Sequence, residues 1–222
     1  TKEFKNYIPR IKNMLGESDI DVINSIRNDK IDIMVNLMGV SSEHRLELFK
    51  NRLAKKQVLW CGYNNTTGID QMDYLISDKN SIYTDEKKFY SEEIIYLKDI
   101  WSCHSGFSKK REFNEAPIIK NKFITFGSFN NYGKLSDEAI ETWSKILKNN
   151  NSKLILKSSV HDHQLLRDNI MSKFKKNGIE ENKIIFMERL KSNEEHLKLY
   201  NKIDISLDTF PFCGATTTFE SL

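Results

Sequence analysis

Hydrophobic residues along the chain follow two spacings, one typical of helices and one typical of strands. Apolar positions three and four residues apart predict helices over residues 2–15, 19–28, 43–53, 161–176 and 193–202. A further helix should follow Ser136, which suits the position that caps a helix N-terminus, as does Ser18. Short apolar runs predict strands at residues 31–37, 57–61, 74–76, 94–97, 123–127, 153–156, 183–187 and 203–207.

The regular alternation of strand and helix predicts an α/β fold with two doubly wound, Rossmann-like lobes facing a cleft. We expect an N-terminal lobe at residues 1–108, a polar linker at 109–121 and a C-terminal lobe at 122–222. The last run, 203–207, should be a buried strand that leads into a helix start. The chain begins without Met and stops within that helix, so we expect a fragment that is incomplete at both ends.

Composition narrows the classes of function. The chain is 39% hydrophobic and 29% charged with a net charge of +3, which is typical of a soluble globular protein. No apolar stretch is long enough for a membrane span, and no aromatic surface suggests a nucleic-acid partner. Three cysteines, without the spacing of metal ligands, indicate free thiols in a reducing compartment, and we expect the cytoplasm.

Two short motifs contain residue types that bind metals, but each has a simpler interpretation. Asp19-Ile-Asp21 lies at a predicted helix start, where carboxylates cap the helix. His161-Asp-His163 lies at the entry of another helix, with no third ligand suggested nearby. We therefore expect no metal site.

Three loops follow predicted strands, at the edge where parallel α/β sheets bind ligands. They span residues 62–68, 126–134 and 214–217. The second ends in Lys134, a compact cation, and the third opens a helix with a glycine and threonines. A cation and a helix N-terminus together suit a diphosphate. Plain helix capping and a solvated lysine are the alternatives.

Several ordered motifs resemble the catalytic region of the O-GlcNAc transferase/SPINDLY glycosyltransferases. In chain order they are Ile31-Asp-Ile-Met-Val-Asn-Leu-Met-Gly39, Gly62-Tyr-x-x-Thr-Thr-Gly68, Met72-Asp-Tyr-Leu-Ile-Ser-Asp78, Phe126-Gly-Ser-Phe-Asn-Asn-x-x-Lys134 and Leu207-Asp-Thr-Phe-Pro-Phe-x-Gly-x-Thr-Thr-Thr-x-Glu-Ser-Leu222. The resemblance implies a GT-B glycosyltransferase that inverts the anomeric carbon. It would move a sugar from a nucleotide sugar, with UDP-GlcNAc favoured, to Ser or Thr hydroxyls of an acceptor protein or peptide. It also implies upstream tetratricopeptide repeats and no cofactor or metal.

The resemblance assigns roles in binding the donor to five residues of the C-terminal lobe. Lys134 matches the catalytic lysine that holds the diphosphate, and Asn131 lies at a polar position that contacts the donor. Gly214 opens the turn in which Thr216 and Thr217 match the threonine pair that caps the diphosphate.

Five further residues receive roles around the nucleoside and the acceptor. Glu220 matches an acid that contacts the ribose, and His196 a histidine that packs against the nucleobase. Arg45, Gly62 and Tyr63 are expected on the acceptor side, in the N-terminal lobe.

One departure from the family pattern leaves the donor open. O-GlcNAc transferases often have His where this chain has Ala215, whereas SPINDLY-like members have a small residue there. A protein O-fucosyltransferase or glucosyltransferase of the same family is therefore an alternative. A protein-interaction module without catalysis is another, and we assign no general base.

Overall fold

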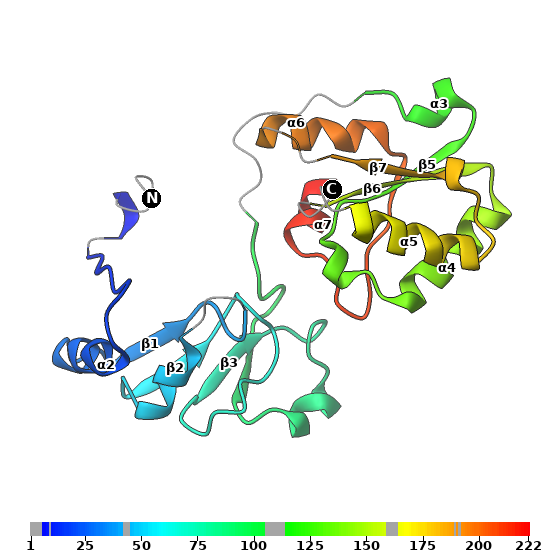
Figure 1. Ribbon diagram of the computed structural model, residues 1–222. Helices are drawn as coiled ribbons and strands as arrows, with labels where there is room; N and C mark the ends of the chain where they lie inside the picture. The colour runs from blue at the N-terminus through cyan, green and yellow to red at the C-terminus, as the bar shows by residue number, and fades with distance from the viewer. Residues whose placement is uncertain are drawn as a thin grey trace. The chain divides into compact units, whose positions relative to one another are not determined.

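The chain divides into two compact units, Thr1–Ser105 and Gly106–Leu222 (Figure 1). The computed structural model describes residues 6–8, 10–41, 45–104, 114–158, 164–188, 190 and 192–222. Each unit contains one sheet of four parallel strands. The last five residues of the predicted linker form a short helix instead, α3 (Pro117–Asn121). Proline suits the first turn of a helix, where its missing N–H would have no intrahelical partner.

In the first unit the strands follow one another across the sheet in chain order. They are β1 (Ile33–Asn36), β2 (Lys56–Leu59), β3 (Tyr74–Ser77) and β4 (Glu93–Tyr96). Because every neighbouring pair is parallel, all four strands end at the same edge. The loops that carry Gly39, Gly62 and Asp78 leave from this edge.

Helical segments of the first unit are shorter than the sequence predicts, with one exception. That exception is α2 (Asp19–Asn28), whose N-terminus is capped by Ser18 as expected. The segment predicted as a helix over residues 43–53 forms the 3-10 helix η1 (Leu46–Asn51), and residues 42–44 lie outside the described chain. It ends at Arg52, which has a left-handed backbone with φ of +47°. A second 3-10 helix, η2, spans Thr84–Phe89.

The predicted helix over residues 2–15 is wrong for most of its described length. Residues 6 and 7 are helical, but residues 10–14 have no regular structure. One feature of the sequence outweighs the apolar spacing. A proline at position 9 cannot donate a helical hydrogen bond, and its ring disfavours helical backbone at the residue before it.

The second unit has the strand order β7-β6-β5-β8. Its strands are β5 (Ile124–Ser128), β6 (Ser152–Lys157), β7 (Ile184–Met187) and β8 (Ile205–Ser206). The chain runs outward from β5 to β7 and then returns to the other side of β5 to form β8. Such a reversal is the switch point at which open α/β sheets bind ligands, outside the carboxyl ends of the strands.

Helices cover both faces of this second sheet. Figure 1 shows α4 (Asp137–Asn149) and α5 (Gln164–Lys176) on one side, and α6 (Asn193–Lys198) on the other. The faces alternate along β6, because Leu154 and Leu156 pack with α4 and α5 while Ile155 packs with Leu199 of η5 (Leu199–Lys202). The predicted cap Ser136 accepts a hydrogen bond from the Ala139 N–H at 3.1 Å. Two 3-10 helices, η3 (Tyr132–Lys134) and η4 (Glu181–Lys183), and α7 (Thr216–Ser221) complete the unit.

The strand predicted at residues 203–207 is present but is shorter and less buried than expected. Only Ile205 and Ser206 pair with β5, and the Ile205 side chain is 46% exposed. Within the described residues β8 is the outermost strand of the sheet, so one of its edges has no neighbouring strand. An apolar run alone does not distinguish a central strand from an edge strand.

Candidate functional site

The loops after β5 and β8 meet at the switch point of the second unit. The Asn130 side chain, 7% exposed, donates from Nδ2 to Asp208 Oδ1 at 2.9 Å. Its Oδ1 accepts from the Thr217 hydroxyl at 2.7 Å. One amide therefore connects the β5 loop, the β8 loop and the first turn of α7.

Asp208 fixes the turn that leads into α7. Its Oδ1 accepts from the N–H groups of Thr209 at 2.8 Å and Gly214 at 2.7 Å. Gly214 is required by close approach, because a Cβ there would lie 2.6 Å from the Thr217 hydroxyl and 2.9 Å from Asn130 Oδ1. The glycine thus allows the threonine and asparagine side chains to meet.

Lys134 lies against this same turn. It ends η3, and its Nζ donates to the Cys213 carbonyl at 3.1 Å and lies 4.5 Å from the centre of the Phe212 ring. The structure therefore brings Lys134 next to the predicted Gly214–Thr217 turn, although 79 residues separate it from Cys213. Thr216 is exposed and Thr217 half-buried. The first N–H groups of a helix have no partner within it, so this end of α7 can donate to a ligand.

Asn131, the polar residue predicted to contact the donor, bends back into its own turn. Its Oδ1 accepts from the Gly133 N–H at 2.9 Å and caps η3. The neighbouring Asn130, for which the sequence predicted no role, makes the connections between loops. Two adjacent asparagines after a strand were the available signal, but the sequence does not show which of them faces Asp208.

The predicted nucleoside residues His196 and Glu220 are in direct contact. His196 Nε2 lies 2.9 Å from Glu220 Oε2, and the Tyr200 hydroxyl donates to the same oxygen at 3.1 Å. The Lys157 Nζ lies 3.0 Å from His196 Nδ1. The Phe129 ring packs beside this group, with its centroid 4.7 Å from that of Tyr200 and 6.0 Å from that of His196.

In the first unit, Gly62 and Tyr63 lie where the β2 loop contacts the β1 loop. A Cβ on Gly62 would lie 2.0 Å from the Leu37 carbonyl oxygen, so no side chain fits. A Cβ on Gly39, which has a φ of +56°, would lie 2.7 Å from the Tyr63 Cβ. Two glycines therefore allow these loops to pack backbone against backbone.

A buried carboxylate holds the rest of the β2 loop. Glu92, 4% exposed, accepts from the Thr66 hydroxyl at 2.8 Å and from the Thr67 N–H at 2.7 Å, and it also bonds the Thr67 hydroxyl. No sequence motif pointed to Glu92, because its partners lie 25 or more residues away.

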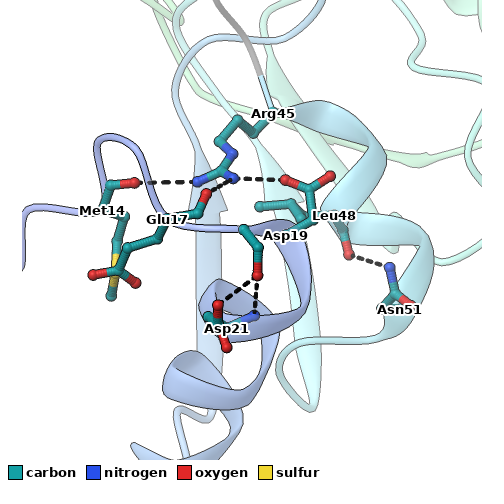
Figure 2. Close-up of polar contacts among 8 residues, drawn as sticks. Met14, Glu17, Asp19, Asp21, Arg45, Leu48 and Asn51 are labelled. Carbon is teal, nitrogen blue, oxygen red and sulfur yellow. Dashed lines mark hydrogen bonds and ion pairs between the residues drawn. The ribbon is translucent and has the colours of Figure 1, made fainter.

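Arg45, expected on the acceptor side, makes contacts that hold the segment before α2 (Figure 2). Its guanidinium donates to the carbonyls of Glu17 at 2.7 Å and Met14 at 3.3 Å, and it pairs with Asp19 at 2.6 Å. These contacts fix the segment to the start of η1. A role for Arg45, Gly62 and Tyr63 at an acceptor stays a prediction.

Side chains with metal-binding chemistry do not converge in the described parts of the chain. No three His, Cys, Asp or Glu side chains form a group there that could hold an ion. Asp19 is paired with Arg45, and Asp21 with the Ser18 hydroxyl at 2.5 Å. The other motif, residues 161–163, lies outside the described residues. The described helices also include none long and apolar enough to cross a membrane.

Comparisons with known proteins place this geometry in a family. The family model of glycosyl transferase family 41 matches residues 15–107 and 111–222. The probable UDP-N-acetylglucosamine–peptide N-acetylglucosaminyltransferase SPINDLY of Eustoma exaltatum subsp. russellianum is 35% identical over 95% of the chain and 23% of its own length. The probable enzyme SEC of Arabidopsis thaliana, described with the same activity, is 29% identical over 87% of the chain and 20% of its own length.

A solved structure shows the same fold. A mutant of the Thermobaculum terrenum O-GlcNAc transferase matches with a TM-score of 0.91 and 26% identity, over 99% of this chain and 42% of that one. The likeness confirms the predicted fold class, Rossmann-like α/β units of the GT-B type. The chain spans less than a quarter of the length of the plant relatives it matches. It belongs to glycosyl transferase family 41.

Proposed function

We propose that this chain is part of an inverting glycosyltransferase that moves a sugar from a nucleotide sugar to Ser or Thr hydroxyls of an acceptor protein. UDP-GlcNAc is the favoured donor, in keeping with the activity for which the plant relatives are named. The observation that carries the proposal is the contact of Lys134 with the turn before α7, at the switch point between β5 and β8.

The chemistry follows from the charge that this site can neutralise. The acceptor oxygen attacks the anomeric carbon from the face opposite the leaving group, its proton passes to a general base or to solvent, and the bond to the diphosphate oxygen breaks. Negative charge grows on that diphosphate as it leaves. Lys134 supplies a compact positive charge, and the first N–H groups of α7 supply hydrogen bonds. Groups already aimed at developing charge stabilise a transition state without reorganising, so no metal is needed in this proposal.

In this proposal the nucleoside of the donor binds beside the turn that precedes α7. In this proposal Glu220 contacts the ribose and His196 packs against the base. Both belong to the second unit, where Tyr200 and Phe129 pack around them. Asn130 then acts indirectly, by holding the turn that binds the diphosphate.

The test is a panel of donors offered to the full-length protein. UDP-GlcNAc, GDP-fucose and UDP-glucose are each incubated with candidate acceptor proteins, with and without EDTA. Intact mass of the acceptor and release of nucleoside diphosphate are measured together. We expect a mass increase of one N-acetylhexosamine from UDP-GlcNAc that persists in EDTA. Transfer from GDP-fucose or UDP-glucose alone would show that UDP-GlcNAc is not the donor. A protein that neither binds nor transfers from any of the three donors would favour an interaction module and overturn the proposal.

A further inference from the structure

Three polar side chains from three elements form a row at the proposed nucleoside site. Lys157 is the last residue of β6, His196 lies on α6 and Glu220 on α7. The Lys157 Nζ is 3.0 Å from His196 Nδ1, and His196 Nε2 is 2.9 Å from Glu220 Oε2. The His196 and Glu220 side chains are only 14% and 10% exposed.

The row determines which ring nitrogen of His196 carries a proton. A lysine ammonium can only donate, so Nδ1 must accept with its lone pair. A neutral imidazole then carries its proton on Nε2, which donates to the Glu220 carboxylate.

We propose that Lys157 is a positioning residue for the nucleoside: it fixes the tautomer and orientation of His196, and through His196 the orientation of Glu220. This inference rests on the proposed function, because it needs the nucleoside to bind at His196 and Glu220. Because Lys157 and Glu220 occupy both ring nitrogens, His196 contacts a nucleobase through the face of its ring. Discrimination between bases must then come from other groups of the site.

The position of Lys157 separates its role from that of Lys134. Lys134 contacts the turn before α7, where the diphosphate is proposed to bind, whereas the Lys157 ammonium is directed at the imidazole. Loss of Lys157 should therefore weaken recognition of the nucleoside and spare recognition of the phosphates. The Tyr200 hydroxyl donates to the same Glu220 oxygen at 3.1 Å. The carboxylate therefore keeps this donor even if His196 turns away once Lys157 is removed.

The test compares two probes in the full-length protein, UDP and inorganic pyrophosphate, by calorimetry or competition. Lys157→Met should weaken UDP binding about tenfold, an ordinary size for coupling between contacting groups, and leave pyrophosphate binding unchanged. Lys157→Arg, which keeps a donor, should recover part of the loss. Lys153→Met is the matched control, because Lys153 lies on the same strand with its Nζ 5.1 Å from the centre of the Phe123 ring. Thermal unfolding checks that each variant folds, and Lys157→Gln replaces the methionine variant if that one does not.

A double-mutant cycle shows whether Lys157 acts through His196. In a His196→Ala background, Lys157→Met should weaken UDP binding no further. Three results would overturn this inference alone. Lys157→Met could weaken UDP binding as much in the His196→Ala background as in wild type, it could weaken pyrophosphate binding as much as UDP binding, or it could leave UDP affinity unchanged. A wild-type protein that binds pyrophosphate but neither UDP nor GDP would instead overturn the proposed function.

Discussion

Asn130 and Asp208 join two loops that lie 78 residues apart in the chain, through a hydrogen bond of 2.9 Å from the amide to the carboxylate. The bond crosses the switch point of the sheet, from the end of β5 to the end of β8. Asp208 also holds the Gly214 N–H, so the amide of one loop supports the backbone of the other. The geometry of the proposed diphosphate site therefore depends on a buried side chain that does not itself need to contact the donor.

Replacing Asn130 should damage both binding and stability. Asn130→Ala leaves the Asp208 carboxylate and the Thr217 hydroxyl without this partner, and such a loss costs about 1–3 kcal/mol of unfolding free energy. We expect a weaker affinity for UDP as well. Chemical unfolding and calorimetry measure the two effects. Asn149→Ala, an exposed change at the end of α4, should alter neither, and a normal UDP affinity in Asn130→Ala would contradict the account of the turn.

Two glycines near the site should respond differently to alanine. In Gly214→Ala the new methyl group meets the Thr217 and Thr218 hydroxyls at 2.6 and 2.8 Å and displaces them, so UDP affinity should fall several-fold. In Gly133→Ala the nearest atom is Asn131 Oδ1 at 3.6 Å, an ordinary contact. That control should bind UDP normally and change stability by no more than about 0.5 kcal/mol. Equal affinities for the two variants would show that the close approach at Gly214 is unimportant.

Glu92 should stabilise the first unit through the loop that carries Gly62 and Tyr63. Glu92→Gln removes a charged acceptor from the N–H and hydroxyl of Thr67, and bonds to charged groups are worth about 1.5–3 kcal/mol. Urea unfolding should show a loss of this size. Glu93→Gln, at the exposed neighbouring position, is the control and should be close to wild type. A loss no larger than that of the control would mean that the loop holds its shape without Glu92.

Stability of the first unit should depend on pH through Asp78. Burial alone would raise the pKa of this carboxyl group, but hydrogen bonds from the N–H groups of Trp101, Ser81 and Asn80 outweigh it and hold the pKa below its ordinary value of 3.8. A lowered folded-state pKa stabilises the fold above the unfolded pKa and loses that contribution as pH falls through the folded value.

The variant Asp78→Asn tests this dependence. At neutral pH it should reduce the unfolding free energy by about 1.5–3 kcal/mol, because charge-assisted bonds are lost. Below about pH 4 the difference in unfolding free energy between the two proteins should narrow. Asp78 of the wild type becomes protonated there and loses its stabilising contribution, which the variant lacks at every pH. Urea unfolding at several pH values measures the gap, with the exposed Asp99→Asn as control. A gap that stays constant down to about pH 2 would contradict the assignment.

Local signals predicted most of the fold. Strands that are short apolar runs, such as β5 and β6, and helices with a serine cap, such as α2 and α4, lie where the sequence places them. Where the prediction failed, backbone conformation outweighed apolar spacing. The proline at position 9 interrupts the helical pattern at residues 2–15, and the left-handed Arg52 ends the one at residues 43–53.

Candidate site residues could be named from the sequence mainly where they belong to a recognisable motif. Lys134, Gly214 and Glu220 were named from such motifs; the structure brings Lys134 to the turn that carries Gly214 and places Glu220 on the following helix, α7. Lys157 lies outside the motifs, and Asn130, although it stands in one of them, was given no role. Their importance comes from partners 78 and 39 residues away, which neither a motif nor local spacing identifies.

The central claim is that Lys134 neutralises a departing diphosphate, and the turnover of Lys134→Ala in the full-length protein tests it most directly. The variant should lose about 100- to 1,000-fold in kcat with the donor that wild type uses, while its unfolding free energy changes by about 1 kcal/mol or less. Lys134→Arg should recover only part, because a planar guanidinium does not replace a compact ammonium. The exposed Lys120→Ala should match wild type. A Lys134→Ala protein that is folded and turns over at a near-normal rate would contradict the account.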